Sequence, residues 1–285
     1  MPVKPAFFGF DDITTHAWML LDHVRLDAYE RAIREVVRPG DVVVDVGTGT
    51  GILALLAARA GARRVYALEH GAVAELAERI VAHNGLSDVV QVIRGDARDA
   101  TFEEPPDVLV SETLGSFGLD EDISALLRVL VRRCRPHVRM IPERLRLFVA
   151  PAEQPRLADE LRSFDSIGGV DLSIVRRRVA QRPTRHSIEA AQLLATPVCV
   201  ADLDLRHDAP PRDFSASFRA TRAGRLDLLA GWFEADLSPS VRLSTSPTEP
   251  DTHWHQLCFP LDPRLDVAEG DALEADIDPR VTGPG

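Results

Sequence analysis

The feature that most constrains the fold is a β-branched strand that runs directly into a glycine-rich turn. Residues 41–46 read Asp-Val-Val-Val-Asp-Val, a composition typical of a strand buried on both faces of a parallel sheet. Gly47-Thr48-Gly49-Thr50-Gly51 follows, and the apolar stretch 52–60 then predicts a helix. Glycines in this spacing permit a tight turn and a close approach of the backbone to a ligand. The unit therefore predicts a ligand site at the carboxyl edge of a parallel sheet.

The same alternation of strand and helix continues to residue 134. The expected strands are residues 64–68, 89–94 and 108–110, and the expected helices are residues 72–84 and 123–134. Before the first strand, residues 7–38 carry an amphipathic helical pattern that ends at Pro39-Gly40. Strands and helices in this order predict an α/β fold with a Rossmann-like, doubly wound sheet.

The pattern of apolar and polar residues changes after Pro142. Short runs of alternating apolar and polar residues, punctuated by proline and glycine, are typical of an all-β module. The strand-like runs are residues 145–149, 214–220, 226–233 and 241–244. We therefore predict a helical segment over 1–38, a ligand-binding α/β domain over 39–141 and a β-barrel-like domain over 142–285.

Charge and cysteine content exclude several classes of function. The chain has 285 residues and a net charge of −11, which argues against binding to nucleic acid and favours a cationic or small acceptor. No apolar run is long enough to cross a bilayer, and no signal peptide is visible at the start, so we expect no membrane partner. Three widely spaced cysteines suggest a reducing cytoplasm and no metal site.

Two acidic residues mark the expected nucleotide-binding edge. Glu69 closes the second strand, at the offset where an acidic side chain commonly meets ribose hydroxyls, and Asp96 follows the third strand as a candidate partner for an adenine amino group. The glycine spacing is G-x-G-x-G, and no second mononucleotide-binding half follows it. This combination favours S-adenosylmethionine over a dinucleotide as the cofactor.

Glu112 and Glu121 lie in one loop-like stretch after the fourth strand. If the chain folds back at Gly115 and Gly118, the two carboxylates converge on one small space. A pair of carboxylates suits a planar guanidinium, which presents five N–H donors in a fixed fork. Taken singly, each glutamate has a simpler explanation as a solvated charge or as a favourable charge at the start of the next helix.

Four motifs together resemble the protein arginine methyltransferase family, within the class I S-adenosylmethionine-dependent enzymes. The similar segments are residues 16–25, 44–53 and 111–121, together with 244–247 and the following 252–256, which reads Thr-His-Trp-His-Gln. The resemblance extends from about residue 7 to residue 275. Because Lys4 is the only lysine, the chain looks like a divergent bacterial member.

The resemblance implies a cofactor site. Arg25 would pair with the carboxylate of S-adenosylmethionine, and Glu69 would hold its ribose. The remaining cofactor-binding residues implied are His16, Asp45, Gly47, Gly49, Gly51 and Asp96.

It also implies the acceptor site and an assembly. Glu112 and Glu121 would clamp the acceptor guanidinium, and Asp22 and His253 would pair across the two domains as further catalytic residues. Met19 would lie beside the transferred methyl group and Trp254 would wall the acceptor pocket. Pro142 matches a cis proline, and residues 157–178 match an arm through which the family forms dimers, so a homodimer is expected.

Several positions depart from the family pattern. Thr113, Ser116 and Asp120 replace bulkier residues of the glutamate loop, Phe10 stands where an aromatic hydroxyl is expected, and the barrel lacks its last strands. We interpret these changes as favouring free L-arginine or another small guanidino compound as acceptor. Peptide or protein arginine is the close alternative.

Two other classes of function stay open at this point. A small-molecule O-methyltransferase would keep the cofactor site but tolerate replacement of the glutamates, and a non-catalytic binding module would bind no cofactor. For guanidino chemistry a proton must leave the acceptor nitrogen, and Glu121 or the Asp22–His253 pair would receive it. Whether one or two methyl groups are added, and whether a dimethylated product is symmetric, depends on pocket volumes near Met19, Ile123 and Trp254.

Overall fold

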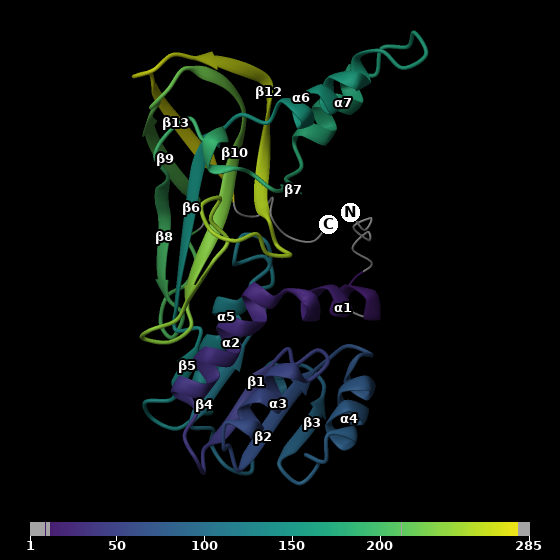
Figure 1. Cartoon of the computed structure of the whole chain (residues 1–285), viewed down its shortest axis with the longest axis vertical. Helices are drawn as coiled ribbons and strands as arrows, with labels where there is room; N and C mark the ends of the chain where they lie inside the picture. The colour runs from purple at the N-terminus through teal and green to yellow at the C-terminus, as the bar shows by residue number, and fades with distance from the viewer. Residues whose placement is uncertain (1–8, 10–11, 212, 279–285) are drawn as a thin grey trace.

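A five-stranded parallel sheet forms the base of the molecule, and antiparallel strands stand above it (Figure 1). The computed structural model describes residues 9, 12–211 and 213–278, so the position of Phe10 and the start of the predicted N-terminal segment lie outside the described residues. The parallel strands are β1 (Val42–Val46), β2 (Arg64–Glu69), β3 (Val90–Arg94), β4 (Val108–Ser111) and β5 (Arg139–Ile141), in the order β3-β2-β1-β4-β5. The helices of this part are α3 (Ile52–Arg59), α4 (Ala74–His83) and α5 (Ile123–Val131).

The register explains why ligand-binding side chains gather at one edge. β1 is buried along its whole length and pairs in parallel with β2 on one side and β4 on the other. The carboxyl ends of all three strands therefore meet at the same edge. The α/β fold is confirmed. β5 was not predicted, because it is only three residues long and begins with an arginine.

The predicted N-terminal helical segment is two helices, α1 (Ile13–Leu21) and α2 (His23–Val36). Asp22 separates them. Its carboxylate accepts a hydrogen bond of 3.0 Å from the Arg25 backbone N–H and caps α2. α2 is tied to the sheet by the buried Tyr29, whose hydroxyl donates to the carbonyl of Ser111, at the end of β4, over 2.9 Å. This hydrogen bond joins α2 to the carboxyl end of β4.

The upper part is a barrel-like β domain, as predicted. One sheet runs β7 (Thr184–His186), β12 (Gln256–Val267), β10 (Gly224–Asp236), β6 (Arg144–Ala152) and β8 (Val198–Asp204), with β11 (Arg242–Ser244) beside β10. A separate ladder joins β9 (Phe214–Arg219) to β13 (Ala272–Ile277), and β9 packs beside β8. The Ile141–Pro142 peptide between β5 and β6 is cis, as the resemblance implied.

The predicted arm is a helical hairpin that projects from the barrel on the same side of the molecule as α1 (Figure 1). It consists of α6 (Pro155–Arg162) and α7 (Ser173–Ala180), and their connection carries an isolated bridge between Ile167 and Val170. Arg176 of α7 pairs with Asp165 within the hairpin at 3.1 Å and with Asp262 of β12 at 3.2 Å, and the second contact holds the hairpin to the barrel. Within the described residues, no helix has the length and apolar character needed to cross a membrane.

Candidate functional site

A cleft of about 1050 Å³ opens over the carboxyl edge of the parallel sheet. Its walls come from α1 and the start of α2, the glycine turn after β1, the ends of β2 and β3, the loop after β4, β7, and the segment 251–255 of the barrel. Predicted site residues that line it include Met19, Glu69, Asp96, Glu112 and Glu121. The fold therefore brings the expected cofactor and acceptor residues to one cavity.

The glycine turn has the conformation that its sequence predicts. Gly47, Gly49 and Gly51 all have positive φ, at 70°, 55° and 86°. A Cβ atom on Gly49 would lie 3.0 Å from the ring of the buried His16, so α1 packs directly on the turn. The carboxylate of Glu69 accepts hydrogen bonds from the backbone N–H groups of Gly49, at 2.9 Å, and Gly71, at 2.8 Å. Glu69 thus stabilises the turn as well as facing the cleft.

Asp45 lies beneath the turn and does not line the cleft. It is 1% exposed, and its carboxylate accepts a hydrogen bond of 2.5 Å from the Thr48 hydroxyl. Burial raises the pKa of this carboxyl to about 7, against the lowering effect of the hydrogen bond from Thr48. The contact that the structure shows for Asp45 is with the turn, and its direct contact with a cofactor stays a prediction.

Arg25 brings a guanidinium into contact with one of the two glutamates. Its Nη1 donates to the carboxylate of Glu112, and its Nη2 donates to the backbone carbonyl of Met19 over 2.8 Å. Both charged side chains are buried, with 7% and 10% of their areas exposed. Arg25 was expected to face the cofactor's carboxylate, and its Nε is buried without a hydrogen-bond partner among the described residues. An anionic group in the cleft would satisfy that donor.

The second glutamate, Glu121, lies across the loop in a strongly perturbed environment. Burial raises its pKa to about 8, and the neighbouring carboxylates of Glu112 and Asp120 add to this effect. The positive charge of Arg185 and a backbone hydrogen bond from Gly115 oppose it. A guanidinium placed between Glu112 and Glu121 would remove the repulsion between the two carboxylates and favour their ionised forms.

Asp22 and His253, which are far apart in the sequence, are in contact between the start of α2 and the barrel. The Asp22 carboxylate accepts hydrogen bonds from the His253 backbone N–H, at 2.9 Å, and contacts its ring Nδ1 at 2.7 Å. Burial raises the pKa of Asp22, but the hydrogen bonds from His253 and Arg25 outweigh it, so the net shift is downward. Trp254 packs against the His253 ring with centroids 4.1 Å apart and lines the cleft.

The glutamate loop is anchored in the barrel by Phe117. This ring is 1% exposed and makes edge contacts with Phe214 and Phe259, with centroids 6.0 Å and 5.9 Å apart. It lies against Gly231 of β10, where an added Cβ would sit 2.7 Å from the ring. Since Glu112 and Glu121 flank Phe117 in the chain, the barrel fixes the geometry of the loop that carries them.

The departures from the family pattern have structural roles within the loop. Ser116 is fully buried, and the Asp120 carboxylate accepts hydrogen bonds from the backbone N–H groups of Ser116, at 2.8 Å, and Phe117, at 3.2 Å. Neither Ser116 nor Asp120 lines the cleft, whereas Thr113 does. Of the three departures, only Thr113 contacts the cleft, whereas Asp120 acts on it through its charge, which helps to raise the pKa of Glu121.

Sequence reasoning missed some residues that shape the site. Arg185 comes from β7 and lines the cleft, but it belongs to no motif. Ser111 donates from its hydroxyl to the Val46 carbonyl over 3.1 Å and joins the ends of β1 and β4. The position of Ser111 directly before Glu112 was visible in the sequence, whereas nothing local identified Arg185.

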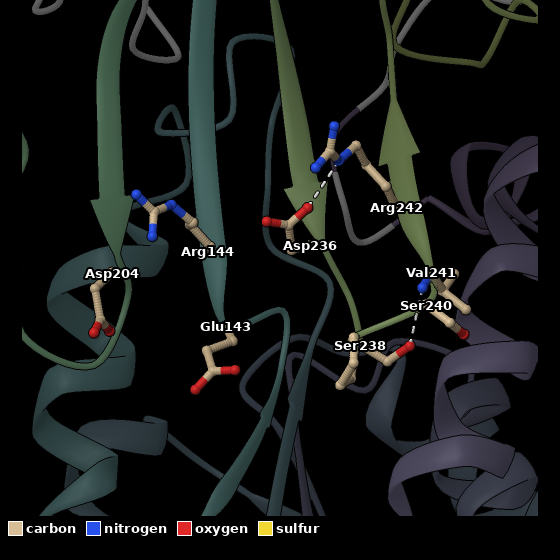
Figure 2. A pocket seen from close by; sticks show the side chains of 9 residues that line it. Glu143, Arg144, Asp204, Asp236, Ser238, Ser240, Val241 and Arg242 are labelled. Atoms are coloured by element: carbon tan, nitrogen blue, oxygen red, sulfur yellow. Dashed lines mark hydrogen bonds and ion pairs between the residues drawn. The ribbon is translucent and has the colours of Figure 1, made fainter.

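A second hollow of about 600 Å³ lies at the lower end of the barrel, beside the ends of β6, β10 and β11 (Figure 2). Its basic residues are already paired: Arg144 contacts Asp202 at 2.5 Å, and Arg242 contacts Asp236 at 2.8 Å. None of the predicted site residues lines it. The chemistry of the protein is therefore assigned to the larger cleft.

Two family models match the chain. Residues 143–281 match the arginine methyltransferase oligomerization subdomain, and residues 25–129 match ribosomal protein L11 methyltransferase. The first covers the barrel and arm, and the second covers most of the parallel sheet with α2.

Individual relatives cover nearly the whole chain. Protein arginine N-methyltransferase PRMT10 of Arabidopsis thaliana is 31% identical over 90% of this chain and 77% of its own length, and protein arginine N-methyltransferase 6 of Danio rerio is 31% identical over 95% and 83%. Among solved structures, a Trypanosoma brucei PRMT1 enzyme-prozyme complex with AdoHcy superposes with a TM-score of 0.88 at 26% identity, covering 94% of this chain and 88% of that one. Arabidopsis thaliana protein arginine methyltransferase 10 superposes with a TM-score of 0.82 at 29% identity, over 96% and 89%.

Proposed function

We propose that arginine residues of a peptide or protein are the acceptor for this chain, which belongs to the protein arginine N-methyltransferase family. The enzyme is an S-adenosylmethionine-dependent N-methyltransferase. What the proposal adds is the form of the acceptor and the roles of the individual site residues.

The observation that carries the proposal is the burial of Glu112 against a guanidinium inside the cleft. Arg25 shows that this carboxylate accepts hydrogen bonds from a planar guanidinium in a mostly water-excluded position. Glu121 lines the same cavity, and the negative charge of Glu112 contributes to its raised pKa. A second guanidinium, from the acceptor, would complete the charge balance of the two carboxylates.

The residues of the cleft fit the cofactor. The glycines of the positive-φ turn have no side chains that would keep a ligand away from the backbone beside Glu69, and the unpartnered Nε of Arg25 suits a carboxylate. Glu69 and Arg25 would hold the ribose and carboxylate ends, and His16 and Asp96 would line the same site. When bound, S-adenosylmethionine supplies an electrophilic methyl group on a sulfonium.

The protein's own residues would orient the acceptor and receive its proton. Two carboxylates hold the guanidinium plane and localise its positive charge away from one nitrogen, which leaves that nitrogen nucleophilic. Positioning of this kind contributes up to about 7–11 kcal/mol in favourable cases. Burial raises the pKa of Glu121 to about 8 in the ligand-free protein. The bound guanidinium would ionise this carboxyl, which would then be the first candidate to receive the proton that leaves the acceptor nitrogen. The Asp22–His253 pair is the second candidate acceptor of that proton, and Met19 would lie beside the transferred methyl group.

A peptide acceptor is preferred over free L-arginine because the argument for a small acceptor has lost most of its basis. Asp120 bonds the loop backbone and Ser116 is buried, so neither residue enlarges the acceptor end of the cleft. The relatives that align with most of the chain are named protein arginine N-methyltransferases.

The test is product analysis by mass spectrometry with labelled cofactor. The enzyme is incubated with an arginine-containing peptide, the same peptide with lysine in place of arginine, and free L-arginine. We expect a mass increase of the arginine peptide, which is lost in Glu112→Gln and Glu121→Gln variants that still bind the cofactor. Labelling of free arginine alone would refute the peptide proposal, and full turnover of the arginine peptide in both variants would refute the role of the two glutamates as the guanidinium clamp.

We also propose that the protein is a homodimer formed through the arm. The hairpin exposes Ile167, Val170 and Ile174, with 50%, 58% and 71% of their areas accessible, and the matching family model is named for oligomerization. Ile174→Asp is expected to give a monomer in sedimentation experiments, whereas Leu265→Asp, at a residue of the barrel that is 48% exposed, is the control and should leave the dimer intact. The cytoplasmic location stays a prediction, which cell fractionation would test.

A further inference from the structure

Thr113, the residue directly after Glu112, is held to the glycine turn by both groups of its side chain. Thr113 and Gly47 both line the cleft. The methyl group of Thr113 packs on Gly47, where an added Cβ atom would lie 2.7 Å from Thr113 Cγ2. The hydroxyl group of Thr113 lies 3.0 Å from the hydroxyl of Ser111. Thr113 therefore connects the loop that carries the two glutamates to the turn expected to face the cofactor.

The direction of the hydrogen bond between Thr113 and Ser111 follows from the other partner of Ser111. A serine hydroxyl has a single hydrogen, and Ser111 donates it to the Val46 carbonyl over 3.1 Å. Ser111 must then accept in its contact with Thr113, and the Thr113 hydroxyl is the donor. Since Val46 is the last residue of β1, this chain of hydrogen bonds ends directly before the glycine turn. The hydroxyl and the methyl group of Thr113 are thus both fastened to the same short segment.

The glycine turn is the better anchored of the two segments. The backbone N–H groups of Gly47 and Thr48 both donate to the Leu68 carbonyl in β2, over 3.0 Å and 2.9 Å. Val46 and Ser111 are partners in the register of β1 and β4, so Gly47 and Glu112 are the next residues along two neighbouring strands. A displacement at this contact would therefore move Thr113 away from the turn, and Glu112 would move with it.

We propose that Thr113 is a positioning residue for methyl transfer, which sets the distance between the Glu112 carboxylate and the cofactor turn. The same contact explains the glycine at position 47, because Thr113 occupies the space that a side chain there would need. The positive φ of Gly47, 70°, is a separate reason for glycine at this position. The proposal rests on the proposed arginine methylation and deepens it, since it assigns a role to a residue that touches neither reacting group.

The expected effect follows from the length of the contact. Carbon atoms in ordinary contact are about 3.5–4.0 Å apart, so a Cβ atom on Gly47 would displace Thr113 by about 1 Å. A misplacement of this size costs about 100-fold in rate when it affects a group that orients the substrate. Apart from the chain neighbours of Gly47, no other atom of the described residues lies within 4 Å of that Cβ. Loss of Thr113 Cγ2 alone would therefore remove the clash.

The experiment is a double-mutant cycle of Gly47→Ala and Thr113→Ser, with kcat measured at saturating cofactor and arginine peptide. Gly47→Ala is expected to lower kcat by about 100-fold. Thr113→Ser, which keeps the hydroxyl, should lower the kcat of wild type but raise that of Gly47→Ala by at least about ten-fold. Gly85→Ala is the matched control for backbone strain, because Gly85 has a φ of 68° and no described atom lies within 4 Å of an added Cβ. Thr101→Ser, at an exposed threonine outside the cleft, is the control for the serine substitution.

Two further measurements do not depend on turnover. The urea concentration at the midpoint of unfolding should fall in Gly47→Ala and rise again when Thr113→Ser is added, because the contact exists in the folded protein alone. Thr113→Ser and Thr113→Val should keep the affinity of wild type for S-adenosylhomocysteine in calorimetry, since the proposed role acts on Glu112. Weaker binding of S-adenosylhomocysteine with an unchanged kcat would overturn the proposal, because Thr113 would then serve the cofactor site.

The outcomes separate this inference from the proposed function. An equal fall in kcat on adding Thr113→Ser to wild type and to Gly47→Ala would show that the two positions act independently, and would overturn the role of Thr113. If Gly47→Ala does not fold, Thr113→Ala decides, because it lacks both fastening groups and a kcat equal to that of wild type would overturn the proposal. Absence of product from every arginine acceptor in wild type would instead overturn the proposed function, while the urea measurements still test the contact between Thr113 and Gly47.

Discussion

Replacing Glu121 with glutamine should stabilise the ligand-free protein while abolishing methyl transfer. Burial, together with the charges of Glu112 and Asp120, raises the pKa of the Glu121 carboxyl from its ordinary value of 4.5 to about 8. Between these two pH values the folded protein keeps a proton that the unfolded chain has lost. The free energy of unfolding therefore decreases as the pH rises through this window. Glutamine has nearly the same shape and carries no charge, so it avoids this loss.

The size of the effect follows from the width of the window. Stability changes by about 1.4 kcal/mol per pH unit while only one of the two states is protonated. The window from 4.5 to about 8 gives a ceiling of about 5 kcal/mol for Glu121. Because the side chain borders an open cleft that water enters, we expect about 2 kcal/mol at pH 8.5, or a melting temperature higher by about 4 °C for a chain of this size.

The assay is differential scanning calorimetry of wild type and Glu121→Gln at pH 5 and pH 8.5. At pH 5 the difference should be smaller, because this pH lies only slightly above the ordinary pKa of 4.5 and little of the pH-dependent loss of stability has accumulated. At pH 8.5 the variant should be the more stable protein, although its kcat/KM with an arginine peptide falls by about two to three orders of magnitude. Glu249→Gln, at an exposed glutamate outside the cleft, is the matched control and should change neither quantity.

Equal melting temperatures at both pH values would refute the reasoning, since Glu121 would then be as well solvated in the folded protein as in the unfolded chain. A variant that is less stable at pH 8.5 would also refute it. That result would mean that hydrogen bonds to the ionised carboxylate outweigh burial and the repulsion from Glu112.

Three further substitutions test the supports of the site. Phe117→Ala removes the ring that anchors the glutamate loop against Gly231. We expect the free energy of unfolding, measured by urea denaturation, to fall by about 3–5 kcal/mol, and kcat/KM to fall as well. An unchanged kcat/KM would show that the barrel does not position the loop. Asp22→Asn should lower the free energy of unfolding by about 1–3 kcal/mol at pH 7 and by much less at pH 3. The reason is that a carboxyl with a lowered pKa stabilises the fold above its unfolded pKa and loses that contribution as the pH falls through the folded pKa. A loss of stability that does not depend on pH would contradict this. Gly49→Ala combines a φ of 55° with a Cβ 3.0 Å from the His16 ring, so calorimetry should show at least about ten-fold weaker cofactor binding, and unchanged affinity would contradict the tight packing of α1 on the turn.

The sequence predicted the parallel sheet well because its signals are local. The β-branched composition of β1 and the glycines after it determine a strand and a turn whatever the rest of the chain does. The positions of Glu69 and Asp96 at strand ends follow from the same alternation. The strand β5 was missed for the same reason, since three residues starting with Arg139 become a strand only by pairing with β4.

The cleft itself depends on contacts between distant segments. His253 meets Asp22 only because the barrel packs over the start of α2, and the resemblance to a family, not the spacing of these residues, led us to expect that contact. Ser116 and Asp120 looked like pocket residues in the sequence, yet the fold turns them toward the loop backbone. A linear motif does not show which way a loop side chain points.

By itself, then, the sequence determined the chemistry available to this protein: a glycine turn for a cofactor and two carboxylates within one loop. Only the tertiary structure decided how these groups are used. Burial inside the cleft raises the pKa of Glu121, and Arg25 and Glu112 form a buried ion pair. Both effects require the removal of water by segments of the α/β domain and of the barrel. The presence of Arg185 in the wall of the cleft likewise depends on the pairing of β7 with β12. Charge and hydrogen-bonding capacity are properties of a residue, but desolvation and proximity are properties of the fold.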